Sequence, residues 1–267
     1  MFGRRLDPAP RRLTPAAFAV AVLTVAALPL ASPLAAQSVG AAQSVGGMLY
    51  AYRPHDGERA RFDEEYRAHL EWHRAAGDTL SWYGWDIVAG RRMGEFVDGT
   101  FGIAFAALDH RVDPAGDAAH AARSFLPHAR ATGQWVVRLR PELGTAAPLE
   151  ARTQGGELVE VVRYTLPLIH QARFEAVLHR VRENAERAGL LPYTVYETVA
   201  GGTDAEFAVF VWRGGMAEFD DDARDPTSAI RRALPAEFAT ALRAESELWR
   251  LRQDLTLIPG RDAAVNR

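Results

Sequence analysis

The feature that most constrains this chain is an internal repeat. Three short segments return at an offset of 112 positions: Ala60-Arg61-Phe62 as Ala172-Arg173-Phe174, Asp113-Pro114 as Asp225-Pro226, and Arg138-Leu139-Arg140 as Arg250-Leu251-Arg252. A fourth segment, Trp85 to Gly90, returns as Tyr196 to Gly201 at an offset of 111. Four matches in the same order at nearly one offset predict a duplicated domain.

Both copies show the same order of predicted elements. In the first copy the patterns predict strands over 48–53, 80–88, 100–108 and 134–140, with helices over 58–76 and from 113 to about 131. In the second copy they predict strands over 158–168, 193–199, 206–212 and 249–258, with helices over 171–188 and 228–245. The order β-α-β-β-α-β is the ferredoxin-like split motif, which leaves one sheet face uncovered. Two copies packed sheet to sheet would bury both open faces.

The segments outside the repeats have their own compositions. Four arginines precede an apolar run over 16–31, which predicts a signal peptide over 1–36 and export to the periplasm or beyond the cell. Residues 37–47 contain a doubled pentapeptide of small and polar residues and are predicted to be a disordered spacer. The first repeat is expected over 48–143, a linker over 144–156, the second repeat over 157–260 and a tail over 261–267.

This element order and its duplication resemble the dimeric α/β-barrel superfamily in a tandem, single-chain form. Relatives there include antibiotic-biosynthesis-type monooxygenases, EthD-like and NIPSNAP-like proteins, and the chlorite dismutase group. The resemblance covers roughly residues 48–258 and carries no catalytic signature. It implies an α+β fold in which two tandem ferredoxin-like βαββαβ repeats form a pseudo-dimeric α/β barrel within a monomeric chain. It also implies that a cofactor or substrate pocket would lie between helix and sheet.

Composition excludes several kinds of chemistry. The chain has no cysteine, so a disulfide framework, a thiolate nucleophile and cysteine-bound metal are absent. It also has no lysine, which excludes a side-chain Schiff base. The net charge is −3 and becomes more negative without the arginine-rich leader. Nucleic acid is therefore not an expected partner, and no membrane span is expected after the leader is removed.

The repeat allows the buried faces of the two first helices to be compared. The second copy has an apolar stripe at helical spacing: Phe174, Val177, Leu178, Val181, Ala185 and Ala188. The offset places a mixed set on the same stripe of the first copy: Phe62, Glu65, Tyr66, His69, His73 and Ala76. Glu65, His69 and His73 thus replace two valines and an alanine at spacings of one turn, so that neighbouring side chains can touch.

This helix presents three chemical alternatives. Histidines at i and i+4 have the spacing of metal ligands, and a nearby carboxylate could complete or orient the set. A neutral imidazole could equally act as a general base or a haem ligand. The third alternative is ordinary packing, with His69 and His73 bonded to backbone or to Glu65. Haem and a divalent metal are both compatible cofactors, and the sequence assigns neither.

The next strand adds aromatic residues and an acid. Alternation predicts that Trp82, Gly84 and Asp86 face one side, with Tyr83 and Trp85 on the other. Gly84 stands where the second copy has Val195, which predicts an open space beside Trp82 and Asp86. Such an aromatic-walled gap would suit a small planar or apolar ligand, although aromatic residues on strands also form ordinary cores.

Other polar groups carry less information. Asp113 is explained as a helix cap and Asp117 as a first-turn acid, while His120 and His128 lie on the second helix and cannot be placed. No serine-hydrolase elbow and no phosphate-binding glycine loop is present.

The candidate pocket therefore consists of Glu65, His69, His73, Trp82 and Asp86. Our first hypothesis is an exported bacterial protein that binds a small aromatic or apolar ligand between the first helix and the sheet of the first repeat. The second is a monooxygenase-like or haem-handling oxidoreductase that uses His69 or His73 in the same pocket. The third is a structural or partner-binding module without a site.

Overall fold

The computed structural model describes residues 45–146 and 158–260, which lie in one compact unit, Ala42–Arg267. The predicted signal peptide, most of the spacer, much of the linker and the predicted tail fall outside the described residues. The first repeat contains β1 (Val45–Pro54), α1 (Arg59–Ala75), β2 (Tyr83–Ala89), β3 (Phe96–Ala104), α2 (Phe105–Asp109), α3 (Pro114–Arg123), η1 (Leu126–His128) and β4 (Ala129–Leu139). The second contains β5 (Leu158–Leu166), η3 (Leu168–His170), α4 (Gln171–Ala188), β6 (Tyr193–Ala200), β7 (Ala205–Arg213), η4 (Met216–Asp220), α5 (Pro226–Ala233), α6 (Phe238–Ala241), β8 (Arg243–Leu251) and η5 (Gln253–Leu255).

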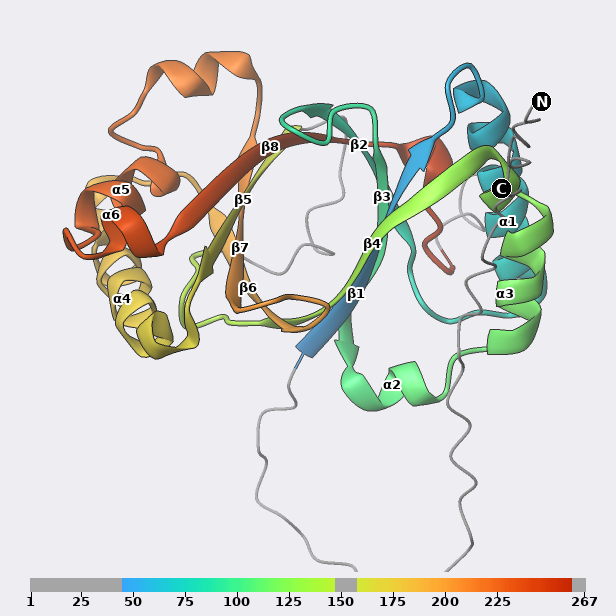
Figure 1. The fold of residues 1–267 in the computed structure, drawn as a ribbon, viewed down its shortest axis with the longest axis horizontal. Helices are drawn as coiled ribbons and strands as arrows, with labels where there is room; N and C mark the ends of the chain where they lie inside the picture. Colours follow the sequence, from blue (N-terminus) through green and yellow to red (C-terminus); the bar gives the residue numbers. More distant parts are fainter. Residues whose placement is uncertain (1–44, 147–157, 261–267) are drawn as a thin grey trace, which may run out of the picture. The chain divides into compact units, whose positions relative to one another are not determined.

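The strands close into one antiparallel barrel in the order β1-β3-β2-β8-β5-β7-β6-β4. Each repeat contributes four adjacent strands, in the order β4-β1-β3-β2 in the first and β8-β5-β7-β6 in the second. Figure 1 shows α1 and α3 packed outside the first half of the barrel, and α4, α5 and α6 outside the second half. The predicted pair of ferredoxin-like repeats packed sheet to sheet is confirmed.

Alternating side chains divide the core into three parts. Inward-facing residues of both repeats, including Trp85, Phe210 and Trp249, fill the barrel. Outward-facing residues pack under the helices of each repeat in two separate clusters. Trp82 belongs to the cluster under α1, while Tyr83 and Trp85 belong to the barrel interior, as alternation predicts.

Equivalent ion clusters hold the two junctions between the repeats. At the β2–β8 junction, Arg252 binds Asp86 at 3.1 Å and Asp63 at 2.9 Å. At the β4–β6 junction, Arg140 binds Glu197 and Glu175, both at 3.0 Å. The members correspond through the repeat: Arg252 to Arg140, Asp63 to Glu175, and Asp86 to Glu197. The repeated Arg-Leu-Arg segment is therefore a junction element.

Several element boundaries differ from the sequence prediction. Residues 45–47, assigned to the disordered spacer, are part of β1. The third strand spans 96–104 instead of 100–108, because Gly90 and Gly94 take positive φ angles and make a short turn. The predicted helix over 113–131 ends at Arg123, and the chain beyond the 3-10 turn at Pro127 joins β4. The helix predicted over 228–245 ends at Ala233, before Pro235, and β8 begins at Arg243.

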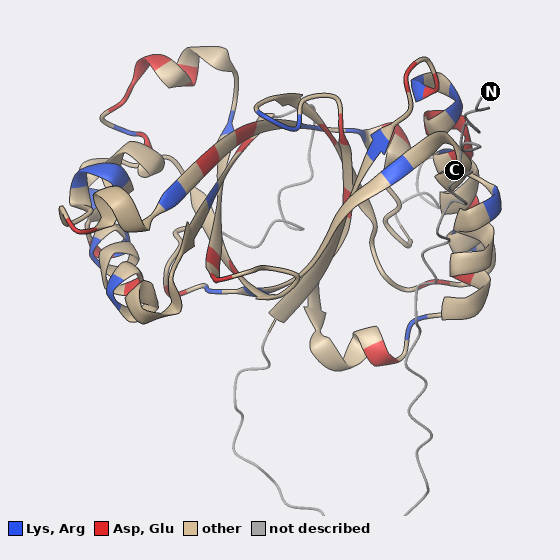
Figure 2. Ribbon diagram, viewed as in Figure 1, with Lys and Arg blue, Asp and Glu red and all other residues tan. Residues whose placement is uncertain are grey.

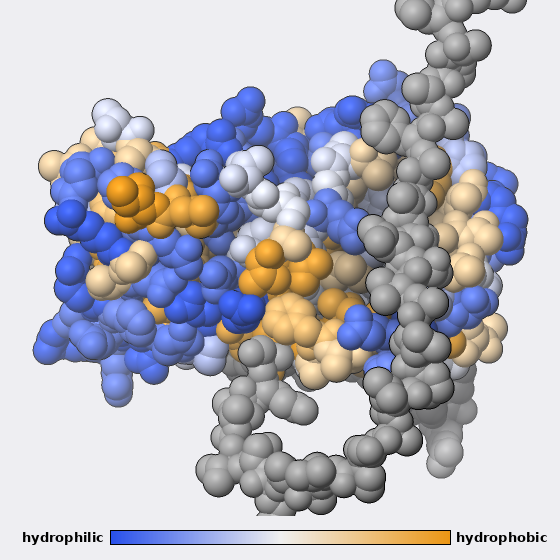
Figure 3. Space-filling model, turned by 60° about the horizontal axis from the view of Figure 1, so that its bottom comes forward, coloured by the Kyte–Doolittle hydropathy of each residue, from blue (hydrophilic) through white to orange (hydrophobic). Residues whose placement is uncertain are grey.

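Both charged and apolar side chains reach the surface. Acidic and basic segments both occur along the strands and helices in Figure 2, for example on β8. Figure 3 shows apolar residues in separate patches among polar ones on one face. Within the described part of the chain, no helix is long and apolar enough to cross a membrane.

Candidate functional site

The buried face of α1 carries the predicted histidines. Phe62, Tyr66, His69, Leu70 and His73 are all buried, so the stripe inferred from the repeat is present. His69 is 6% exposed and His73 is 4% exposed, which places both imidazoles within the packed layer between helix and sheet. Their rings lie against Trp72, Trp82 and Phe125. Buried polar groups need partners, and both histidines have them.

His73 is oriented by Asp78. The Nδ1 atom of His73 lies 2.8 Å from Oδ2 of Asp78, and the indole N–H of Trp82 donates to the same oxygen at 2.9 Å. The backbone N–H of Leu80 donates to the other oxygen at 2.9 Å. Burial would raise the pKa of Asp78, but these hydrogen bonds outweigh it and hold the pKa below its ordinary value. The ionised Asp78 therefore accepts a hydrogen bond from the N–H at Nδ1 of His73, and in that tautomer Nε2 carries the lone pair.

His69 joins α1 to α3. Its Nδ1 atom lies 3.0 Å from Nδ1 of His120, and its Nε2 atom lies 3.2 Å from Oδ1 of Asp117. Burial lowers the pKa of His69, with the hydrogen bond to Asp117 opposing that shift. The pKa of His120 is also lowered, first by burial and then by the neighbouring His69. A neutral imidazole at His69 is therefore favoured.

The two imidazoles meet at Asp117. Nε2 of His73 lies 3.5 Å from Oδ1 of Asp117, the same oxygen that faces Nε2 of His69. One ligand atom from each of the three residues lies within 4.8 Å of the others. Zinc bonds of about 2.0–2.1 Å at tetrahedral angles separate ligand atoms by roughly 3.3–3.4 Å. The two histidine–carboxylate separations match that edge, so the three residues fit a divalent transition metal.

The outer contacts complete the arrangement of a metal site. Metal-binding histidines usually donate the second ring N–H to a carboxylate or another acceptor, which fixes the ring and its tautomer. Asp78 does this for His73, and His120 is the hydrogen-bond partner of the second nitrogen of His69. Arg111 lies 3.8 Å from the other oxygen of Asp117.

Two residues of the predicted pocket lie elsewhere. Glu65 forms an ion pair with Arg61 at 2.7 Å instead of contacting a histidine. Asp86 is bound by Arg59 and Arg252 in the junction cluster. The open space predicted beside Gly84 is also absent, and that prediction was wrong. A Cβ atom at Gly84 would lie 2.5 Å from the carbonyl oxygen of Leu255 and 2.7 Å from the ring of Phe96.

Sequence reasoning missed Asp78 and Asp117, although the repeat contains the signal for both. Asp78 follows the helix-ending Gly77, and its counterpart in the second repeat is Leu190. Asp117 corresponds to Ala229, and its first-turn position on α3 was explained by the helix dipole alone. Both acids thus replace apolar residues, as His69 and His73 replace Val181 and Ala185.

A second buried acid lies under the same helix. The hydroxyl of Tyr66 donates to Oδ2 of Asp98 at 2.6 Å, and Oδ1 of Asp98 has no partner among the described residues. Burial raises the pKa of Asp98 to about 7. Strand register equates Asp98 with Val209, so this acid is also specific to the first repeat.

Haem does not fit the histidines in this arrangement. The Nε2 atoms that would bind iron both face Asp117 across 3.2 and 3.5 Å, which leaves no room for a porphyrin between them. The faces of the rings are covered by aromatic side chains. The donor set instead suits a bare divalent ion.

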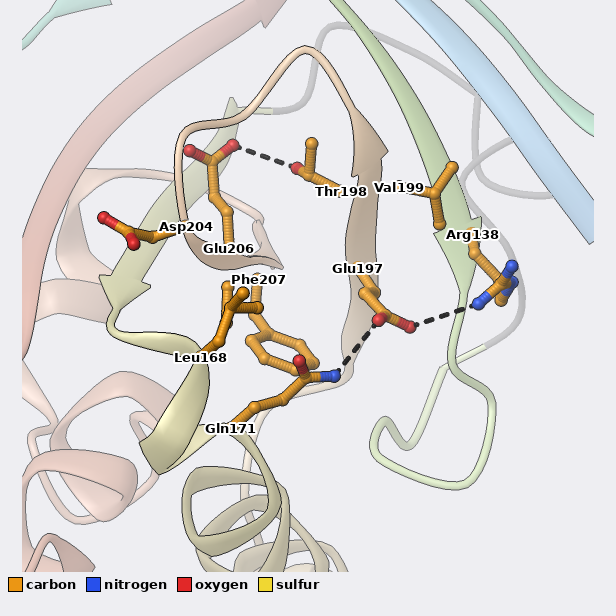
Figure 4. Close-up of a pocket in the computed structure, with 10 residues that line it drawn as sticks. Arg138, Leu168, Gln171, Glu197, Thr198, Val199, Asp204, Glu206 and Phe207 are labelled. Atoms are coloured by element: carbon orange, nitrogen blue, oxygen red, sulfur yellow. Dashed lines mark hydrogen bonds and ion pairs between the residues drawn. The ribbon is translucent and has the colours of Figure 1, made fainter.

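A cavity of about 370 Å³ lies in the second repeat, beside β6 and β7 (Figure 4). Several of its polar groups are already paired. Gln171 donates to Glu197 at 3.2 Å, Arg138 lies 3.6 Å from the same carboxylate, and Thr198 donates to Glu206 at 2.9 Å. This cavity borders the β4–β6 junction, and we assign its acids to that junction and to the adjoining hairpin.

Comparison with known proteins supports the fold. No protein-family model matches the chain, and none of the curated proteins matches its sequence. Among solved structures, it is similar to a provisionally assigned monooxygenase from Fusobacterium nucleatum, with 8% identity and a TM-score of 0.53 over 79% of this chain and 94% of that one. It is also similar to a mutant chlorite dismutase from Candidatus Nitrospira defluvii, with 10% identity and a TM-score of 0.52 over 79% and 92% of the two chains.

These similarities concern the fold. The chain has the fold of the dimeric α/β-barrel proteins, with both halves of the barrel in one polypeptide. At such low identity the similarity extends to the fold alone, and it says nothing about the role of the histidine site.

Proposed function

We propose that this protein binds one divalent transition metal ion through His69, His73 and Asp117. The observation that carries the proposal is the convergence of two imidazole Nε2 atoms on one carboxylate oxygen, at 3.2 and 3.5 Å. We propose a metal ion instead of the aromatic or apolar ligand expected from the sequence, because neighbouring atoms fill the space beside Gly84 where that ligand would lie.

Electrostatics explains why a cation belongs between these groups. With the proton of His73 on Nδ1, its Nε2 lone pair faces the negative oxygen of Asp117. Two acceptors that face each other in a buried layer are unfavourable unless a proton or a metal ion lies between them. A metal ion would satisfy His69, His73 and Asp117 together, whereas a single proton satisfies one pair. Zinc is our first choice because it accepts imidazole and carboxylate ligands at these separations.

Replacement by apolar residues in the second repeat supports a dedicated site. The counterparts of His69, His73, Asp78 and Asp117 are a valine, an alanine, a leucine and an alanine, in a repeat with the same fold. The scaffold therefore folds without these polar groups. Buried polar groups that the scaffold does not require are candidates for function.

The proposal is tested by zinc titration calorimetry on the chelator-treated protein. We expect one ion per chain, and a loss of affinity of at least about tenfold in His73→Ala and in Asp117→Ala. The control is His55→Ala, which removes an exposed imidazole and should change affinity less than twofold. Zinc binding of equal strength in all four proteins would refute the assignment, as would an absence of binding by the folded wild-type protein.

A second candidate function is metal-dependent oxidation at the same site. Two histidines and one carboxylate are also the donor set of non-haem Fe(II) oxygenases. The side chain of Asp117 is 20% exposed, so a further ligand could approach from its side. Oxygen consumption by the Fe(II)-loaded protein that is lost in His73→Ala would favour this function, and zinc binding without such consumption would favour a non-redox role.

We also propose that the chain is exported, because of the predicted signal peptide over residues 1–36. N-terminal sequencing of protein recovered from the periplasm or the medium would test this. A mature N-terminus near Gln37 is expected, and an intact leader on protein confined to the cytoplasm would contradict export.

A further inference from the structure

The second repeat has a cleft of about 340 Å³ that is separate from the histidine site. It lies between strands β5 and β8 and the segment that begins with α5. Val162 and Tyr164 form its buried floor, Leu234 and Leu242 line its sides, and Arg231 and Ser246 stand at its exposed rim. Its volume lies at the lower end of the range of about 300–1,000 Å³ that is typical of small-molecule sites.

A difference between the repeats explains why the cleft is open. Val162 is paired with Ser246 in the sheet, and the equivalent pair in the first repeat is Tyr50 with Gln134. Both large side chains of the first repeat are therefore replaced by small ones. The volume that they would occupy contributes to the cleft of the second repeat.

The charges of the cleft favour an anion at the rim. Glu160 is 7% exposed and is already satisfied, because Arg213 donates to one of its oxygens and Ser246 donates to the other at 3.0 Å. Arg231 is exposed, and its guanidinium forms no ion pair with any described residue. The neighbouring Arg232, in contrast, is paired with Asp222 at 2.7 Å.

We propose that this cleft binds a small monocarboxylate with an apolar body. Arg231 would hold the carboxylate, since a guanidinium matches that group in geometry and charge. The hydroxyl of Ser246 lies at the same rim, and the apolar body would cover Val162, Tyr164 and the two leucines. This site needs no metal and is independent of the function proposed for the first repeat.

Isothermal titration of the chelator-treated protein with octanoate and with phenylacetate tests the proposal. At least one of the two acids should bind, and the matching uncharged amide should bind at least about tenfold more weakly. Arg231→Met keeps the apolar stem and removes the charge, so it should weaken binding of the acid by about tenfold or more. Arg232→Met on the same helix is the matched control and should change affinity less than twofold.

A second variant tests the volume of the cleft instead of its charge. Val162→Tyr introduces the residue of the first repeat and should abolish binding while circular dichroism remains unchanged. If this variant fails to fold, the comparison of Arg231→Met with Arg232→Met decides. The proposal is overturned if the folded wild-type protein binds neither acid at millimolar concentration, if octylammonium binds more tightly than octanoate, or if the two arginine variants lose affinity equally.

Discussion

Arg252 of the second repeat holds Asp86 of the first at 3.1 Å across the β2–β8 junction. The equivalent Arg140 holds Glu197 at 3.0 Å across the other junction. Both arginines are about four-fifths buried and each binds more than one carboxylate, so that removing either takes a cation away from at least two acids at once.

We predict that Arg252→Ala and Arg140→Ala each lower the free energy of unfolding by about 1–3 kcal/mol. Urea denaturation measures the change. The control is Arg250→Ala on β8, an exposed arginine of the same repeated segment, which should cost less than about 0.5 kcal/mol. Equal losses in all three variants would mean that the junction clusters have no special role.

Asp78→Asn should weaken zinc binding by about 10–100-fold without removing any ligand. The amide keeps one acceptor oxygen, but it loses the second one and the charge that keeps the proton of His73 on Nδ1. Calorimetry gives the affinity, and the Nδ1 and Nε2 resonances of His73 report its tautomer by NMR. An unchanged affinity combined with a changed tautomer would show that orientation of His73 does not matter for the metal.

Metal binding should be visible as stabilisation. At a free zinc concentration 100 times the dissociation constant, the wild-type protein should gain about 2.7 kcal/mol. His69→Val with His73→Ala introduces the residues of the second repeat and should abolish this gain. Thermal denaturation with and without zinc measures both. The same gain in the double variant would place the ion elsewhere.

Asp98 predicts a pH dependence with a definite sign. Its folded pKa of about 7 lies above the unfolded value, so the folded state holds the proton more tightly. The contribution of Asp98 to stability is complete below about pH 4 and is lost as pH rises through about 7. Asp98→Asn mimics the protonated acid and still accepts from Tyr66, so it should remove this loss.

In the metal-free protein, Asp98→Asn should raise stability by about 2–4 kcal/mol at pH 8 and leave it nearly unchanged at pH 4. Urea denaturation at both pH values tests this. The control is Asp56→Asn, an exposed acid in the turn before α1, which should change stability by less than about 0.5 kcal/mol at either pH. A gain of equal size at both pH values would show that the effect is not titration of Asp98.

Gly84→Ala should destabilise the fold by about 1–3 kcal/mol, because the added methyl group would overlap the Leu255 carbonyl and the Phe96 ring. Gly215→Ala is the control, since a Cβ atom there would meet nothing within 4 Å. Chemical denaturation of both variants gives the comparison. If Gly84→Ala left the stability unchanged, the open space expected from the sequence would be supported after all.

The fold was predictable because duplication doubled every signal. The helix over 171–188 and the strand beginning at Tyr193 occur where the periodicity places them. Predictions failed where tertiary pairing overrides local pattern: Ala129 to Ala131 resemble a helix end, but they pair with β1. Only part of the proposed metal site could be predicted from the sequence. Comparing the buried faces of the two first helices identifies His69 and His73. Asp117 lies on another helix, α3, and only the packing of α3 against α1 places it beside them. The prediction of an open space beside Gly84 was wrong because the sequence does not show which neighbouring atoms occupy the space that a glycine leaves.

The closed eight-stranded barrel also determines how many sites one molecule can hold. In a dimer of two identical subunits every buried feature would occur twice, and any polar substitution would destabilise the core of both subunits. Covalent fusion removes that constraint, since one half can keep aliphatic packing under its helix while the other accepts histidines and acids. The arginine–acid clusters at the two junctions hold the repeats together while the residues under their helices differ. The buried histidines and acids accordingly occur once per two-repeat chain, and the proposed site would hold one metal ion per molecule.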